Sequence, residues 1–153
     1  MTEIEYKQGD ATVASVGEKT YIVHICNNLG AWGAGFVLPL AKRYPKSREV
    51  YFAHKRDLPL GTNQPVYIDE SVTIFNMIAQ DGFPSREHPV AVSYKALEKC
   101  LTEIGQIAAS TGYTVQMPRI GCGIGGGRWQ DVEGIVKRTL CAQDVPVRVL
   151  DFA

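Results

Sequence analysis

Residues 21–35 decide the fold of this chain and read Tyr-Ile-Val-His-Ile-Cys-Asn-Asn-Leu-Gly-Ala-Trp-Gly-Ala-Gly. The first part, Tyr21 to Cys26, is a near-continuous apolar run, typical of a strand that is covered on both faces. The second part, Asn27 to Gly35, is rich in glycine and predicts a loop. A strand buried on both faces needs helices on either side of its sheet, so the stretch predicts an α/β fold.

Strand and helix patterns alternate along the rest of the chain. Short apolar runs predict further strands at residues 4–8, 65–69, 72–79, 114–117 and 146–150. Helices are expected at residues 36–41, 46–54, 94–112 and 129–140. The alternation favours a mixed central sheet between two helical layers, which is a three-layer α/β/α architecture.

The length of 153 residues, with 45% hydrophobic and 21% charged residues, predicts one domain over residues 1–153. Sixteen basic and sixteen acidic residues cancel, so no net field draws the chain to nucleic acid or to an anionic membrane. The four cysteines form no Cys-x-x-Cys pair, and neither a metal nor another cofactor is expected. A polar N-terminus and the lack of a long apolar run predict a monomeric, cytoplasmic protein without a membrane segment.

A second glycine-rich loop, Gly121 to Gly127, has five glycines in seven residues. Each glycine costs about 0.5–1 kcal/mol relative to alanine, so their number favours close approach of a ligand over a purely structural turn. Successive N–H groups ahead of a helix bind phosphate. Only 26 residues follow Gly127, too few for the rest of a Rossmann domain, and no Gly-Lys-Ser/Thr closes the loop. With the first loop, Gly30 to Gly35, it suits a diphosphate held from two sides.

Three segments resemble the macrodomain family in order and spacing, and the resemblance covers essentially the whole chain. They are residues 9–12 (Gly-Asp-Ala-Thr), residues 23–27 running into Gly33-Ala34-Gly35, and residues 117–123 (Met-Pro-Arg-Ile-Gly-Cys-Gly). The last is specific to the branch with the terminal ADP-ribose protein glycohydrolase and ADP-ribose 1″-phosphate processing proteins. The resemblance implies a macrodomain fold and a cleft for ADP-ribose.

The resemblance also implies ligand contacts. Asp10 matches the aspartate that accepts a hydrogen bond from the adenine amino group, with a helix-cap or turn aspartate as the alternative. Phe152 stacks on adenine or, equally, covers the core. Asn27 falls near the distal ribose. The implied ligand-binding set is Asp10, Ala11, Asn27, Asn28, Gly33, Ala34, Gly35, Phe36, Gly121, Cys122, Gly123, Ile124, Gly125, Gly126, Gly127 and Phe152.

The candidate catalytic residues are His24, Asn27 and Gln80. The resemblance places a lysine where this chain has Gln80 and a loop aspartate where it has Gly125, so a lysyl adduct is not expected. His24 matches a histidine of phosphatase-like members, although a core histidine is equally ordinary. Another route needs only positioning, with a water held by Asn27 or by a ligand phosphate attacking the anomeric carbon.

Two functions follow from these residues. The first is a hydrolase that removes ADP-ribose from acidic side chains of modified proteins or processes ADP-ribose 1″-phosphate. The second is a non-catalytic reader of ADP-ribose or of ADP-ribosylated protein, and a different nucleotide ligand is a third. A reader usually accompanies another domain, so a single domain favours the enzyme.

Overall fold

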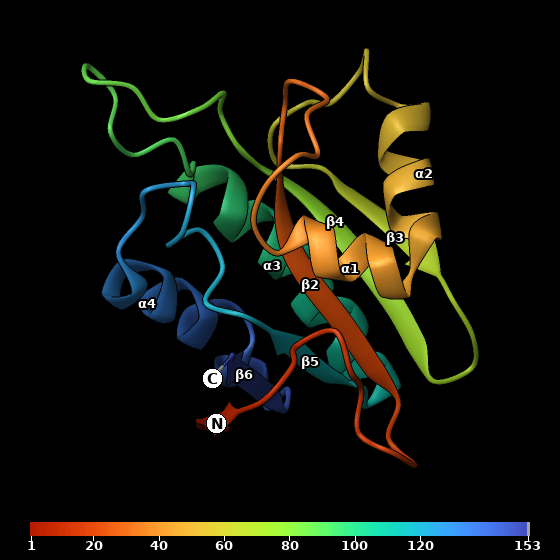
Figure 1. The fold of residues 1–153 in the computed structure, drawn as a ribbon. Coiled ribbons are helices and arrows are strands. Elements are labelled where there is room, and N and C mark those ends of the chain that lie inside the picture. Colours follow the sequence, from red (N-terminus) through yellow and green to blue (C-terminus); the bar gives the residue numbers. More distant parts are fainter. Residues whose placement is uncertain (153) are drawn as a thin grey trace.

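The computed structural model describes residues 1–152 as a three-layer α/β/α fold (Figure 1). The last residue of the predicted domain, 153, lies outside the described residues. Six strands form one sheet in the order β1-β6-β5-β2-β4-β3. Neighbours are parallel except for β3 and β4, so the predicted mixed sheet is confirmed. The strands are β1 (Ile4–Gln8), β2 (Thr20–Asn27), β3 (Asn63–Tyr67), β4 (Val72–Gln80), β5 (Thr114–Met117) and β6 (Val147–Asp151).

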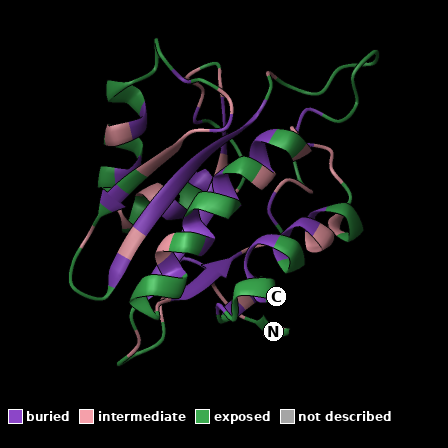
Figure 2. Ribbon diagram, turned by 180° about the vertical axis from the view of Figure 1, so that it is seen from behind, coloured by how far each residue is buried: buried purple, intermediate pink, exposed green. Residues whose placement is uncertain are grey.

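Helices cover both faces of this sheet, as the apolar run in β2 predicts. Ile22 and Cys26 of β2 belong to the core under the first two helices, whereas Tyr21 and Val23 belong to the core under the other two. Every residue of β2 except Ile25 is buried. Figure 2 shows that the helices are exposed on the sides turned away from the sheet. No helix in the described part of the chain is long and apolar enough to cross a membrane. The helices are α1 (Val37–Arg43), α2 (Pro45–Ala53), α3 (Tyr94–Thr111) and α4 (Trp129–Thr139), followed by a 3₁₀ turn, η1 (Cys141–Gln143).

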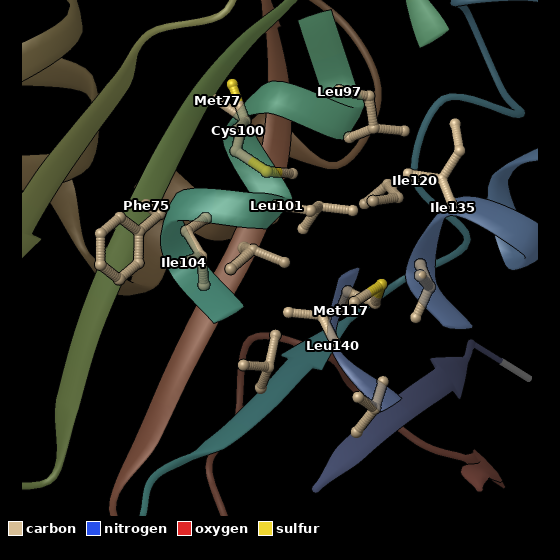
Figure 3. Packing of buried hydrophobic residues seen from close by; sticks show 14 of the residues in the cluster. Phe75, Met77, Leu97, Cys100, Leu101, Ile104, Met117, Ile120, Ile135 and Leu140 are labelled. Atoms are coloured by element: carbon tan, nitrogen blue, oxygen red, sulfur yellow. The ribbon is translucent and has the colours of Figure 1, made fainter. Parts of the chain in front are cut away.

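The larger core lies between the sheet and α3 and α4 (Figure 3). Leu97, Leu101 and Ile104 form the predicted apolar stripe of α3, and all three side chains are fully buried. Burying one such side chain contributes about 1.5–3 kcal/mol. Ser93 caps the start of α3 by accepting the Ala96 N–H at 3.1 Å, and the helix ends before Gly112, which has a left-handed φ of 77°.

The structure differs from the sequence predictions at β3 and at η1. β3 begins and ends two residues earlier than predicted, because the Asp69 carboxylate accepts the N–H groups of Ser71 and Val72 and shapes the turn. Pro65 is tolerated in β3 because this is an edge strand. The turn η1 was not predicted, since apolar periodicity carries no signal for three residues.

Helix α3 approaches the C-terminal end of α4 closely at Gly105. A Cβ there would lie 2.5 Å from the Thr139 carbonyl oxygen and 2.8 Å from Gln143 Nε2. Gly105→Ala is therefore expected to lower the free energy of unfolding in urea by about 1–3 kcal/mol. The matched control is Gly134→Ala in α4, where a Cβ would meet only Arg138 Nη1 at 3.5 Å. The control should gain about 0.4–1 kcal/mol, and equal effects of the two changes would contradict this packing.

Candidate functional site

A cleft of about 310 Å³ opens at the carboxyl ends of β2 and β5. The register pairs Ile22 of β2 with Gln116 of β5, so the last residue of β5, Met117, is level with Val23. Strand β2 continues to Asn27, and its last four residues line the cleft. The early end of β5 thus leaves room for the second glycine loop beside the exposed end of β2.

The side chain of Asn27 shapes the first glycine loop. Its Oδ1 accepts the N–H groups of Leu29 at 2.9 Å and Ala31 at 3.2 Å, and its Nδ2 donates to the Ala31 carbonyl at 2.8 Å. The Tyr51 hydroxyl donates to the Asn27 carbonyl at 2.6 Å. Asn27 lines the cleft, but these bonds occupy the groups that would hold a water, so its catalytic role stays a prediction.

Asn28 ties the same loop to the end of β4 and does not line the cleft. Its Nδ2 donates to Asp81 Oδ1 at 3.0 Å, and its Oδ1 accepts the Gly82 N–H at 2.9 Å. The side chain therefore supports the site from behind.

Part of the glycine content of the second loop serves the protein's own packing. A Cβ at Gly126 would lie 2.2 Å from the Pro89 carbonyl oxygen, and one at Gly127 would lie 2.7 Å from the Gly121 carbonyl oxygen. Gly126 also has a left-handed φ of 73°. Gly126 and Gly127 lie outside the cleft lining, and the structural alternative accounts for both.

Gly33 and Gly123 of the two loops face open space. A Cβ at Gly33 or Gly123 would meet no described atom within 4 Å, and both residues line the cleft. A Cβ at Gly35 would lie 3.2 Å from Ile124 Cδ1, so the two loops meet across the cleft at this point. Here the absence of side chains keeps the cleft open.

Both loops present backbone donors that the protein leaves free. Within residues 1–152, no protein acceptor is recorded for the N–H groups of residues 33–36 in the first loop or 121–125 in the second. Successive free N–H groups in a concave segment attract phosphate oxygens. The cleft is therefore suited to an anionic ligand without any lysine in its lining.

His24 lies in the wall of the cleft as a buried, neutral imidazole. Asn76 donates its Nδ2 to the Ser47 carbonyl, so its Oδ1 accepts the His24 Nε2–H at 2.6 Å. Burial lowers the pKa of His24 to about 4, although the bond to Asn76 acts in the opposite direction. The ring also packs against Trp32 and Phe36. These contacts favour the core-histidine alternative over acid–base catalysis.

Gln80 and Gly125 are neighbours in space. Gln80 donates its Nε2 to the Gly82 carbonyl at 2.9 Å. A Cβ at Gly125 would lie 3.3 Å from Gln80 Oε1 and 3.0 Å from the Gly121 carbonyl oxygen. The two positions where the resemblance implies a lysine and an aspartate therefore hold a neutral amide facing a bare backbone.

Asp10 and Phe152 lie outside the lining of the cleft, as do Ala11 and Cys122. Asp10 Oδ1 accepts the Thr12 N–H at 2.9 Å and the Thr12 hydroxyl at 2.7 Å, as a turn aspartate does. The hydroxyl of Thr12 holds the pKa of Asp10 below its usual value. Phe152 is 84% exposed, so the alternative that it covers the core is wrong.

A buried glutamine holds the Asp10 loop in place. Gln116 of β5 donates its Nε2 to the carbonyls of Ala11 at 3.0 Å and Val13 at 2.9 Å. Its Oε1 accepts from Arg148, which is paired with Glu18. This chain of polar contacts fixes Asp10 relative to the sheet.

Sequence reasoning missed eight residues that line the cleft: Ile25, Cys26, Ala31, Val37, Phe83, Pro118, Arg119 and Ile120. Arg119 donates to both carboxylate oxygens of Asp151, at 2.7 and 3.0 Å, and lies over the rings of Tyr6 and Trp129. It belongs to the segment 117–123 that carries the resemblance, which could have found it. Phe83 lies in an irregular loop after β4, where no periodic pattern marks it.

Comparison with known proteins places this geometry in a family. The chain is 37% identical to a macrodomain protein from Streptomyces coelicolor, with a TM-score of 0.85 over 99% of this chain and 100% of that one. It is 36% identical to a protein of unknown function from Bacteroides thetaiotaomicron, with a TM-score of 0.93 over 98% of both. An ADP-ribose 1″-phosphate phosphatase from Lodderomyces elongisporus is 28% identical over 97% of this chain and 99% of that protein. No family model matches the chain.

The identity to a macrodomain protein over that protein's full length, together with the shared fold, shows that the chain belongs to the macrodomain family. The resemblance in the three sequence segments is thereby confirmed. Two of these segments contribute to the glycine loops, and the same two loops line the cleft at one end of the sheet.

The buried state of His24 predicts a pH dependence of stability. Its pKa is lowered in the folded chain to about 4 from an unfolded value near 6.5, so the unfolded chain binds more protons between these values. Stability is therefore fully present above pH 6.5 and is lost as the pH falls toward 4, by about 3 kcal/mol at most.

Urea unfolding across this pH range checks the prediction. His24→Gln should reduce the loss, because glutamine carries no proton, whereas the exposed His88→Gln should retain it. An unchanged pH dependence in the His24 variant would contradict a neutral buried imidazole.

Proposed function

We propose that this chain binds ADP-ribose in the cleft and hydrolyses ADP-ribose 1″-phosphate. The observation that carries the proposal is the pair of facing loops, whose N–H groups at residues 33–36 and 121–125 have no recorded protein acceptor within residues 1–152. A hydrogen bond to a charged oxygen contributes about 1.5–3 kcal/mol. Four or five such bonds, offset by the cost of association, suit a micromolar Kd, which corresponds to about 8 kcal/mol.

The adenosine end of the ligand is proposed to lie at Asp10. Its Oδ1 is occupied by Thr12, and Oδ2 lies 3.8 Å from Arg43 Nη2, a distance that leaves it available to an amino group. The exposed Phe152 side chain is close in sequence to Asp151, which Arg119 at the cleft holds by two bonds. Stacking of adenine on Phe152 would add about 1–3 kcal/mol.

The substrate is proposed from the relatives. The Lodderomyces elongisporus protein carries the name ADP-ribose 1″-phosphate phosphatase, and its similarity extends over nearly the full length of both chains. Removal of ADP-ribose from acidic side chains of proteins is a second proposed activity, which rests on the resemblance at residues 117–123. In both substrates the anomeric carbon carries a group that departs as an anion, either phosphate or a carboxylate.

A non-catalytic reader is the alternative, and one observation favours it. The three candidate catalytic side chains are engaged or neutral: His24 is bonded to Asn76, Asn27 is bonded to its own loop, and Gln80 is an amide. Measurable hydrolysis of ADP-ribose 1″-phosphate distinguishes the hydrolase from the reader.

We also propose that the protein acts as a cytoplasmic monomer that binds neither nucleic acid nor membrane. Its zero formal net charge supports the absence of a nucleic-acid or membrane partner. Four free cysteines, three of them buried, suit a reducing compartment.

Substitutions at the open glycines test binding. Gly33→Ala and Gly123→Ala place a methyl group in space that the protein leaves free, so each should weaken ADP-ribose binding at least about tenfold without loss of stability. Calorimetry with ADP-ribose gives the Kd, and Gly134→Ala is the control with an unchanged Kd. Wild-type affinity in both loop variants would remove the ligand from this part of the cleft.

Substitutions at Asp10 test the adenosine end and the reaction together. Asp10→Ala should raise the Kd for ADP-ribose and the KM for ADP-ribose 1″-phosphate about tenfold or more, whereas Asp10→Asn keeps an acceptor oxygen and should lose less. Release of phosphate by the wild-type chain is expected. Binding without any release would establish the reader, and absence of binding would refute the assignment to ADP-ribose.

A further inference from the structure

The cleft offers donors for an anion but few groups that can attack one. Its polar side chains within residues 1–152 are His24, Cys26, Asn27, Gln80 and Arg119. This set contains no hydroxyl, carboxylate or amine. Enzymatic attack on phosphorus by a protein side chain would therefore fall to Cys26 or His24.

Neither of these two side chains is placed as a nucleophile. Cys26 is 3% exposed, and its Sγ lies 3.9 Å from both ring nitrogens of His24. Burial raises the pKa of the thiol and lowers that of the imidazole, so both groups are neutral near pH 7. A neutral thiol beside a neutral imidazole is a poor nucleophile, and the Nε2 proton of His24 is already donated to Asn76.

Each of the three carboxylates around the cleft accepts a hydrogen bond from a protein donor through at least one oxygen. Asp10 accepts from Thr12, Asp81 accepts from Asn28, and Asp151 accepts from Arg119. None of the three lines the cleft. A general base that would activate water for attack on phosphorus is thus missing from the described lining.

Attack of water on the anomeric carbon of the substrate requires no nucleophilic side chain. This carbon is bonded to the ring oxygen, whose lone pair stabilises positive charge as the leaving group departs, as in glycoside hydrolysis. A phosphate monoester has a second pKa near 6, so part of the substrate carries a proton at neutral pH and can release phosphate as the stable hydrogen phosphate anion. Free N–H groups that face a departing anion stabilise its charge by hydrogen bonds, and no acidic side chain is needed.

Resting on the proposed function, we infer that the cleft cleaves the bond between C1″ and the bridging oxygen of ADP-ribose 1″-phosphate, not the bond between that oxygen and phosphorus. The C1″–O bond breaks with its electron pair going to the phosphate. The oxygen of water forms the new bond to C1″, and the proton that water loses passes to the departing phosphate. The products are ADP-ribose and inorganic phosphate.

Gln80 is the residue of this chain best placed to orient that water. It is 8% exposed, lines the cleft, and commits its Nε2 to the Gly82 carbonyl. Its Oε1 then faces Gly125, with no hydrogen bond recorded to it in the described part of the chain. An amide oxygen accepts a hydrogen bond from water and tolerates the positive charge that develops on the anomeric carbon. A lysine in this position would oppose that charge.

Hydrolysis in ¹⁸O-labelled water identifies the broken bond. Released phosphate is the species to weigh by mass spectrometry, because its oxygens do not exchange with neutral water, whereas the anomeric hydroxyl does. The inference predicts unlabelled phosphate. A phosphatase that cleaves the oxygen–phosphorus bond, run in the same water, gives the labelled control.

The outcomes separate the inference from the function on which it rests. Phosphate with one ¹⁸O atom would overturn the inference and leave the proposed phosphatase activity standing, whereas no phosphate release would overturn both. The 1″-O-methyl glycoside of ADP-ribose provides a second test, since its alkoxide leaving group needs an acid. It should bind but release no methanol, and its cleavage would show that an acid operates in the cleft.

Discussion

The parallel pairing of β2 with β5 is the constraint on which the site depends. Three residues of β5 pair with residues 20–22 in the first half of β2, and the longer strand then continues without that neighbour. The second glycine loop fills the gap and packs against Ile25 at Gly121. A longer β5 would close the cleft with sheet, and a shorter β2 would remove its wall.

The glycines of the two loops have two separate roles: some allow close packing of the loop, and others leave the cleft open. Gly126 and Gly127 allow the second loop to pack against residues 89–92, where a side chain has no room. Gly33 and Gly123 meet nothing, and their bare backbone borders the cleft. The sequence shows five glycines in the second loop without distinguishing these uses, because both require the same residue type. The two uses are distinguished only by the residues that the fold brings next to each glycine.

The fold was largely predictable because its signals are local. The apolar run at residues 21–26 and the stripe in α3 each predict an element from its own residues, and the structure confirms both. The site was predictable at the level of its two loops. The roles of its side chains were not predictable, because Asn27, His24 and Asp10 form hydrogen bonds with partners 2 to 52 residues away in the chain. Such partners decide whether a polar group is free to act or already engaged.

A crystal structure with bound ADP-ribose tests the central claim most directly. The account predicts the diphosphate between the two loops, with its oxygens within hydrogen-bonding distance of N–H groups at residues 33–36 and 121–125. It also predicts the adenine amino group on Asp10. A diphosphate elsewhere on the molecule, or one held by side chains while these N–H groups stay free, would contradict the account.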